Sequence, residues 1–156
     1  MEVYNVSLFG HRKRNDLMRL ENRLSPIIKE LILTKTYVVF MIGRNGEFDE
    51  YAASVIKRVT KECGRNNSDI TLVLPYCVAD IEYYEEYYDS IVIPEILYGA
   101  HPKSAIKLRN RWMVEHSDKV IGYIEHENGG AYTAMKYAES LNKDCINIYR
   151  EIAPLG

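Results

Sequence analysis

Short runs of apolar and β-branched residues alternate with longer amphipathic segments along the whole 156-residue chain. The clearest run, YVVFMI at 37–42, is apolar at nearly every position, as in a strand that is buried on both faces of a sheet. Alternation of this kind predicts parallel strands that are connected by helices. Six strands are predicted, at 3–9, 37–42, 70–74, 90–93, 120–124 and 145–149.

The segments between these strands repeat their apolar residues at helical spacing. In the first segment, Asn15 or Asp16 is the expected cap, and Pro26 is expected to kink or restart the helix. In the second, Asp49 is placed to cap a helix that Gly64 would end. Helices are predicted at 15–33, 49–63, 102–116 and 130–141, and 79–88 is either irregular or a short helix.

We therefore expect an α/β fold with one domain, 1–156, built on a Rossmann-like parallel or mostly parallel sheet of about six strands with helices on both faces. Right-handed crossovers would place the first strand at the centre of the sheet, beside a crevice where the winding reverses. Ligands of such folds bind in that crevice, beyond the carboxyl ends of the strands. The loops that follow the strands are therefore the expected place of function.

Charge and cysteine content limit the function classes. Lys and Arg total 20 and Asp and Glu total 22, a formal net charge of -2, so nucleic acid is not the expected partner. Cys63, Cys77 and Cys145 form no CxxC pair, which predicts free buried thiols and no metal site. Because no segment has the ~18 apolar residues of a membrane span and the first residues do not look like a leader, we expect a cytoplasmic protein without a membrane partner.

A glycine pair gives the sharpest signal, in the loop after the fifth predicted strand. Gly129 and Gly130 let the backbone approach a ligand closely and adopt positive φ. They stand where a helix begins, and its first N–H groups and dipole favour an anion such as phosphate. Thr133 adds a hydroxyl in the first turn. The alternative is a tight turn in which Asn128 or Thr133 only caps the helix.

The loop after the first strand carries basic groups toward the same crevice. Gly10 ends the strand, His11 follows directly, and Arg12 could bind a phosphate through its guanidinium. For Lys13 and Arg14, a solvated basic turn is the favoured interpretation.

The loop after the second strand, 43–49, is also rich in glycine. Gly43 permits close approach of a ligand, whereas Asp49 could bind a ribose hydroxyl or simply cap its helix. The first strand is not followed by GxGxxG, so a standard NAD site is not expected, and the missing GxxxxGK[ST] excludes a P-loop kinase or ATPase.

The helix at 102–116 contributes two further candidates. Arg109 and Asn110 lie beside its apolar stripe and could reach the strand ends. Alternatively, Arg109 and Arg111 could form surface pairs with Glu115 or with the acidic Tyr/Glu segment. Four residues are expected to face the sheet: Ala105, Leu108, Trp112 and Met113.

Four segments, SLFGHR, GRNGEFDEYAA, RNRWMVEHSDKVIGY and NGGAYTAMKYA, occur in this order along the chain. With them the chain resembles the SLOG superfamily over 7–149. That superfamily has a Rossmann-like fold and includes the DNA-processing protein DprA, the "lonely guy" phosphoribohydrolases that activate cytokinins, and nucleotide-sensing domains. The chain looks most similar to the small bacterial and phage members that open with a Gly-His-Arg turn.

The resemblance implies that Gly129, Gly130 and Thr133 contact a nucleotide. The phosphoribohydrolases carry PGGxGTxxE, whereas here Asn128 replaces the proline, Tyr132 the third glycine and Lys136 the catalytic glutamate. The resemblance therefore implies the phosphate cradle without that glutamate. It also implies that the same pocket is lined by Gly10, His11, Arg12, Gly43, Asp49, Arg109 and Asn110.

The leading hypothesis is a protein that binds a nucleotide or a nucleotide-derived small molecule, with no further cofactor, for sensing, sequestering or regulation. The anionic group would lie on the helix start, and Tyr132 or another tyrosine would stack on the base. Tyr83, Tyr84, Tyr87 and Tyr88 could supply that stacking or could merely cover a sheet edge.

Two alternatives stay open. Hydrolysis or transfer at an N-glycosidic bond needs a carboxylate and an acid, for which the candidates are His11, Glu47, Asp49 and Glu95. A single-stranded nucleic-acid module would use the arginines and lysines of the first loop and of the helix at 102–116: Arg12, Lys13, Arg14, Arg109 and Arg111. A homodimer is compatible with either, since folds of this class often pair helices.

Overall fold

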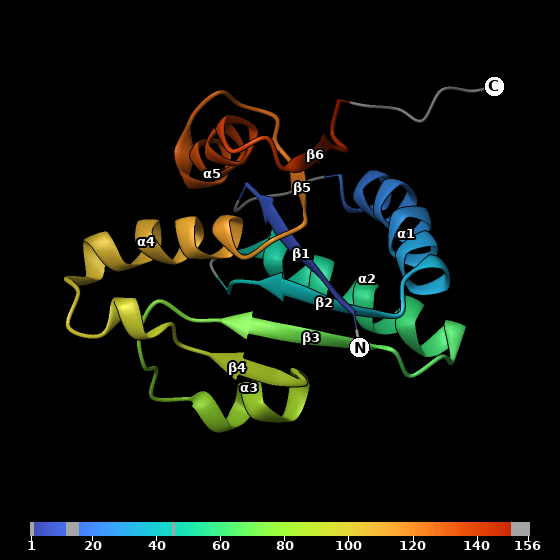
Figure 1. The fold of residues 1–156 in the computed structure, drawn as a ribbon, viewed down its shortest axis with the longest axis horizontal. Helices are drawn as coiled ribbons and strands as arrows, with labels where there is room; N and C mark the ends of the chain where they lie inside the picture. Colours follow the sequence, from blue (N-terminus) through green and yellow to red (C-terminus); the bar gives the residue numbers. More distant parts are fainter. Residues whose placement is uncertain (1, 12–15, 45, 151–156) are drawn as a thin grey trace.

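The computed structural model describes residues 2–11, 16–44 and 46–150. Within these ranges, six parallel strands form one sheet in the order β4-β3-β2-β1-β5-β6 (Figure 1). The predicted α/β fold and the central position of the first strand are confirmed. The strands are β1 (Val3–Gly10), β2 (Tyr37–Ile42), β3 (Ser68–Val73), β4 (Ser90–Val92), β5 (Lys119–Tyr123) and β6 (Asp144–Asn147).

Helices cover both faces of this sheet, as predicted (Figure 1). Helices α1 and α2 pack against each other on one face, and α4 and α5 pack against each other on the other. The segment 79–88 contains a short helix, one of the two alternatives for it. The helical elements are α1 (Leu17–Thr34), α2 (Glu47–Cys63), α3 (Ile81–Tyr87), the 3-10 turn η1 (Glu95–Leu97), α4 (Pro102–Glu115) and α5 (Gly129–Ser140).

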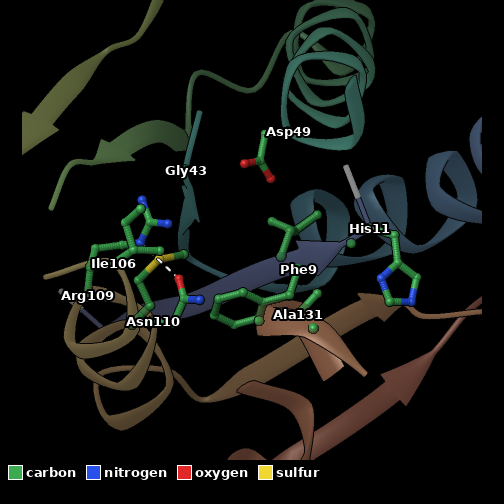
Figure 2. Close-up of a pocket in the computed structure, with 13 residues that line it drawn as sticks. Phe9, His11, Gly43, Asp49, Ile106, Arg109, Asn110 and Ala131 are labelled. Atoms are coloured by element: carbon green, nitrogen blue, oxygen red, sulfur yellow. Dashed lines mark hydrogen bonds between the residues drawn. The ribbon is translucent and has the colours of Figure 1, made fainter. Parts of the chain in front are cut away.

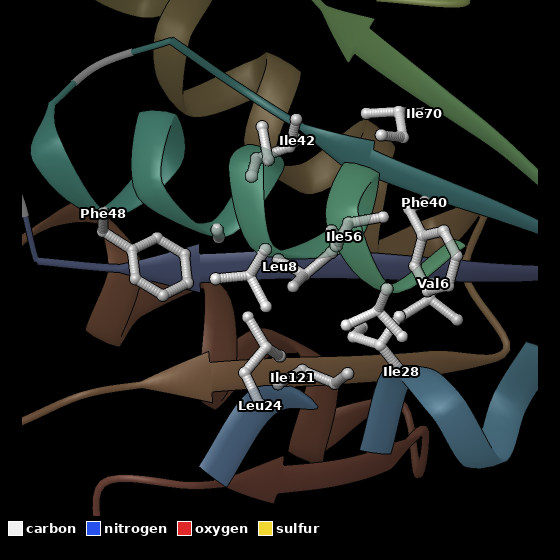
Figure 3. Close-up of a cluster of buried hydrophobic side chains, with 14 of the residues drawn as sticks. Val6, Leu8, Leu24, Ile28, Phe40, Ile42, Phe48, Ile56, Ile70 and Ile121 are labelled. Carbon is white, nitrogen blue, oxygen red and sulfur yellow. The ribbon is translucent and has the colours of Figure 1, made fainter. Parts of the chain in front are cut away.

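Strand β1 separates two apolar clusters because its side chains point alternately to opposite faces. Val6 and Leu8 pack into the cluster under α1 and α2 (Figure 3), whereas Phe9 packs into the cluster under α4 and α5. The hydroxyl of Ser7 is buried and lies 2.6 Å from that of Ser117. One polar pair is thus built into the second face.

Helix α1 runs through Pro26 without interruption, so the predicted restart is wrong. Pro26 is exposed, while Leu24 and Ile28 on either side are fully buried and anchor the helix to the sheet. Asp16 stands at the N-cap position, but its side chain makes no capping hydrogen bond; its carboxylate instead accepts a hydrogen bond of 2.7 Å from the hydroxyl of Tyr123. Asn15 lies outside the described residues.

Helix α2 begins two residues earlier than predicted, at Glu47, with Gly46 at the N-cap. Asp49 is therefore a residue of the first helical turn and not the cap. Its carboxylate remains favourably placed near the positive end of the helix dipole. Gly64 ends the helix as predicted, in the left-handed conformation with φ of 62°.

Two predictions about the whole chain meet the structure in part. Among the described residues, all three cysteines are free thiols, but none is buried: Cys63 and Cys145 are half-buried and Cys77 is exposed. The helices in the described ranges are too short or too polar for any of them to cross a membrane.

Candidate functional site

A cavity of about 350 Å³ opens at the carboxyl ends of β1 and β2 (Figure 2). It lies between the starts of α2 and α5 and the flank of α4. These three helices and the ends of the two strands all contribute to its lining. Its lining includes eight residues that the sequence singled out: Gly10, His11, Gly43, Asp49, Arg109, Asn110, Gly129 and Gly130. The remaining lining residues are Leu8, Phe9, Ile106, Met113 and Ala131, which sequence reasoning did not assign to the site.

Gly10 allows α2 to approach the end of β1. A Cβ at this position would lie 2.3 Å from the ring of Phe48, which is 1 % exposed, so only glycine leaves room for that ring. Phe48 in turn fixes the first turn of α2, in which Asp49 is the next residue. The carboxylate of Asp49 points into the cavity (Figure 2).

The burial of Arg109 is the unexpected feature of the site. Its side chain is 2 % exposed and lies on the buried face of α4, not beside that face and not in a surface pair with Glu115. Its Nη1 donates to the carbonyl oxygen of Val73 at 3.0 Å, and its Nε donates to Oδ1 of Asn110 at 2.9 Å. Of the four predicted inward residues, Leu108 is 38 % exposed, whereas Trp112 is half-buried and packs against the cluster under α4 and α5.

The guanidinium of Arg109 fits because Gly43 has no side chain. A Cβ at Gly43 would lie 2.9 Å from Nη1. Burial lowers the pKa of Arg109 from its usual range, and the negative charge of Asp49 partly offsets that effect. An arginine stays protonated even so, which places a buried positive charge at the wall of the cavity.

The start of α5 presents main-chain groups to the same cavity. Gly129 has φ of 88°, a conformation that favours glycine, and both Gly129 and Gly130 are exposed. The side chain of Asn128 makes no capping hydrogen bond in the described structure, and the described first turn contains no acidic residue. The first N–H groups of α5 are thus available to an anion.

Thr133 and Tyr132, both predicted to bind the ligand, lie outside the lining of this cavity. The hydroxyl of Thr133 donates to the carbonyl oxygen of Gly129 at 3.0 Å within its own helix. Tyr132 lines a separate small hollow beside β5 and β6, and Lys136 lies over its ring. Tyr132 is thus turned away from the crevice, whereas Thr133 lines the neighbouring hollow between α4 and α5.

His11 lies at the opposite end of the cavity from Arg109 (Figure 2). The backbone N–H of His126 donates to its Nε2 at 3.0 Å, which fits a neutral ring with the proton on Nδ1. Arg12, predicted beside it, lies outside the described residues.

The other candidate side chains are not brought to the cavity. Among the described residues, Glu47 and Glu95 are absent from its lining, so Asp49 is the predicted carboxylate that reaches it. The four tyrosines of the α3 region belong elsewhere too: three of them, Tyr84, Tyr87 and Tyr88, pack against the α1–α2 cluster, as edge cover would. The described residues hold no cluster of three or more His, Cys, Asp or Glu that could hold a metal ion.

The sequence matches no known family model and no curated protein. The structure, however, is similar to that of DNA processing protein A (DprA) from Streptococcus pneumoniae, with a TM-score of 0.65 and 15% identity over 92% of this chain and 49% of that one. It is also similar to DprA from Helicobacter pylori, described for its single-stranded DNA binding mode, with a TM-score of 0.60 and 15% identity over 91% of this chain and 63% of that one.

A third similar structure is TM1055, a structural genomics target, with a TM-score of 0.56 and 14% identity over 91% of this chain and 72% of that one. This chain spans about half of the S. pneumoniae DprA chain. At these identities the similarity concerns the fold. The Rossmann-like fold that the resemblance to the SLOG superfamily implied is confirmed.

Proposed function

We propose that the protein binds a nucleotide or a nucleotide-derived small molecule in the cavity at the carboxyl ends of β1 and β2, in a sensing, sequestering or regulatory role. One observation carries the proposal: a single cavity combines the open amide groups of a helix start at Gly129 and Gly130 with the buried guanidinium of Arg109. Both groups favour an anion, and phosphate is bound at helix starts of this kind in nucleotide-binding proteins.

The rest of the cavity suits the remainder of a nucleotide. Asp49 offers a carboxylate that could accept hydrogen bonds from ribose hydroxyls. Phe9 and Ile106 give an apolar wall against which a base could pack, in place of the predicted tyrosines. The volume of about 350 Å³ falls within the range of small-molecule sites.

The test is a panel of nucleoside monophosphates, ADP-ribose and cyclic dinucleotides, followed by thermal shift and by release of free base in the same samples. A ligand at a hundredfold excess over its dissociation constant should stabilise the fold by about 2.7 kcal/mol. Stabilisation by an intact ligand supports binding. If no member of the panel shifts the unfolding temperature, the proposal is wrong.

Cleavage of an N-glycosidic bond is the second candidate, because His11 and Asp49 line the same cavity. Asp49 could stabilise positive charge at the anomeric carbon, and His11, once protonated on Nε2 in place of the hydrogen bond from His126, could give that proton to the departing base while a water molecule adds to the anomeric carbon. Release of free base that stops in both Asp49→Asn and His11→Gln would support this activity. Release that survives both substitutions would exclude these residues as the catalytic pair.

Binding of single-stranded DNA, for which the H. pylori DprA structure is described, is the third candidate. The formal net charge of -2 disfavours it. Affinity for an oligonucleotide that falls steeply with salt would be its signature.

A further inference from the structure

A second hollow adjoins the cavity. It lies between α4 and α5, has a volume of about 560 Å³ and shares Ile106, Asn110 and Gly130 with the cavity. We call it the α4–α5 groove. Because these three residues line both spaces, a ligand seated in the cavity can extend past Gly130 into the groove.

The α4–α5 groove is basic. Lys103, Lys107 and Arg111 follow one another at four-residue spacing and therefore share one face of α4. All three side chains are exposed, and none of the described residues that line the groove is acidic. In a chain with a formal net charge of -2, this positive charge is local to the groove.

The far wall of the groove holds one of these cations in place. The guanidinium of Arg111 lies over the ring of Tyr137, 4.5 Å from its centroid. The hydroxyl of Tyr137 donates to the carboxylate of Glu115, and this hydrogen bond helps to hold the ring in place. Contact with an aromatic face leaves the edge of a guanidinium able to donate to an anion.

We propose that the physiological ligand has at least two phosphate groups, as in a nucleoside diphosphate or a dinucleotide, and that the groove binds the part beyond the first phosphate. This inference rests on the proposed function. The first phosphate lies on the start of α5, and Gly130, which lines both spaces, lets the chain of the ligand pass. The next phosphate lies among Lys103, Lys107 and Arg111.

The size of the basic surface favours a small ligand over a nucleic-acid strand. Three cations along two turns of α4 match a few phosphate charges. Single-stranded nucleic acid is instead bound along a continuous basic groove with several aromatic stacking platforms. A nucleoside monophosphate, in turn, would occupy the cavity and leave the groove unused.

The experiment measures dissociation constants by calorimetry for nucleoside mono- and diphosphates of the common bases, a linear 5′-phosphorylated dinucleotide and a short single-stranded DNA. The wild-type chain is compared with a Lys103→Ala/Lys107→Ala variant. The matched control is Lys29→Ala/Lys61→Ala, which removes two exposed lysines from α1 and α2 on the opposite face of the sheet. Thermal unfolding confirms that both variants fold.

We expect the diphosphate or the dinucleotide to bind at least about tenfold more tightly than the base-matched monophosphate. The Lys103→Ala/Lys107→Ala variant should lose this advantage while its affinity for the monophosphate stays within about twofold of the wild type. The control variant should keep the advantage.

Three results would overturn the inference. If monophosphates bind and a second phosphate adds nothing, the groove is not used, although the proposed function stands. If the DNA binds more tightly than the dinucleotide and with a steep salt dependence, the surface recognises a strand. If none of these ligands binds, the inference and the proposed function both fail.

Discussion

The two faces of the sheet are built differently, although both meet at the end where the cavity opens. The α1–α2 face is an apolar cluster without a buried charge among its described members, and Phe48 closes its end (Figure 3). The α4–α5 face contains the buried hydroxyls of Ser7 and Ser117 and the buried guanidinium of Arg109. We therefore expect the α1–α2 face to contribute most of the stability, whereas polar groups and the cavity take up part of the interior of the α4–α5 face.

Two glycines mark this difference. At Gly10, the space that a side chain would occupy is filled by the ring of Phe48 from the α1–α2 face. At Gly43, the corresponding space is filled by the guanidinium of Arg109 from the α4–α5 face. A glycine at the strand end therefore admits an apolar ring on the α1–α2 face and a positive charge on the α4–α5 face.

The largest expected effect is on stability, at the α1–α2 face, whose end Phe48 closes. Phe48→Ala should lower the free energy of unfolding by about 3–5 kcal/mol, because it removes a fully buried ring and leaves a cavity between α2 and β1. Urea unfolding measures the loss. The exposed Ile96 gives the control: Ile96→Ala should change stability by less than about 0.5 kcal/mol. A loss below ~1 kcal/mol for Phe48→Ala would mean that this face is not the stabilising one.

Arg109→Met tests the other face, and here binding should suffer more than stability. Loss of the charged donor should weaken nucleotide binding about a hundredfold, since hydrogen bonds to charged groups contribute about 1.5–3 kcal/mol. Stability should change by less than about 2 kcal/mol, because an apolar side chain of similar size replaces a buried charge. Arg65→Met, at an exposed position after α2, is the control for calorimetry and urea unfolding. Unchanged affinity in Arg109→Met would remove the guanidinium from the site.

The strand ends of the site could be predicted because they follow from local rules and topology. Gly10 and Gly43 stand directly after predicted strands, the glycine pair at 129–130 lies in the loop after another, and a parallel sheet brings those strand ends together. Charged residues, by contrast, are expected on the solvent face of an amphipathic helix. Burial of Arg109 depends on the absent side chain of Gly43, a contact between distant segments that no helical pattern shows.

The direction of the side chains around the first turn of α5 was equally hard to predict. Each residue rotates by about 100° around a helix, so the site depends on where the helix begins. It begins at Gly129, one residue earlier than predicted; Tyr132 lines a separate hollow, and Thr133 lines the α4–α5 groove instead of the cavity. Sequence reasoning located the helix start but could not fix this rotation.

Gly130→Val should weaken binding about tenfold and leave the fold intact. A Cβ at Gly130 would meet the side-chain nitrogen of Asn110 at 3.6 Å, an ordinary contact, so the change adds bulk over the amides without a clash. Gly130→Ala should give a smaller loss, and the two variants form a series in thermal shift with a bound nucleotide. Full affinity in Gly130→Val would show that the anion does not lie on the start of α5.

The smallest effect concerns Tyr88, which belongs to the α1–α2 cluster but whose pKa is also affected by Asp49 of the cavity. Its pKa is raised from the usual 10.0, first by burial and then by the negative charge of Asp49. The unfolded chain therefore loses this proton at a lower pH than the folded chain, so the stabilisation is complete below pH ~10 and declines as the pH rises further. Stability should fall by about 1 kcal/mol between pH 10 and 11 on account of this residue.

Tyr88→Phe should remove that part of the decline, whereas Tyr98→Phe, at an exposed position, should not. Urea unfolding at pH 9, 10 and 11 measures both variants against the wild type. The slope will not vanish, because burial also raises the pKa of Tyr4, Tyr37 and Tyr87. Adding Asp49→Asn to the wild-type chain should reduce the decline slightly, since the carboxylate raises the pKa of Tyr88 less than burial does. If Asp49→Asn removes as much of the decline as Tyr88→Phe, the charge of the site and not the apolar seal controls this residue, and the division between the two faces is less sharp than their packing indicates.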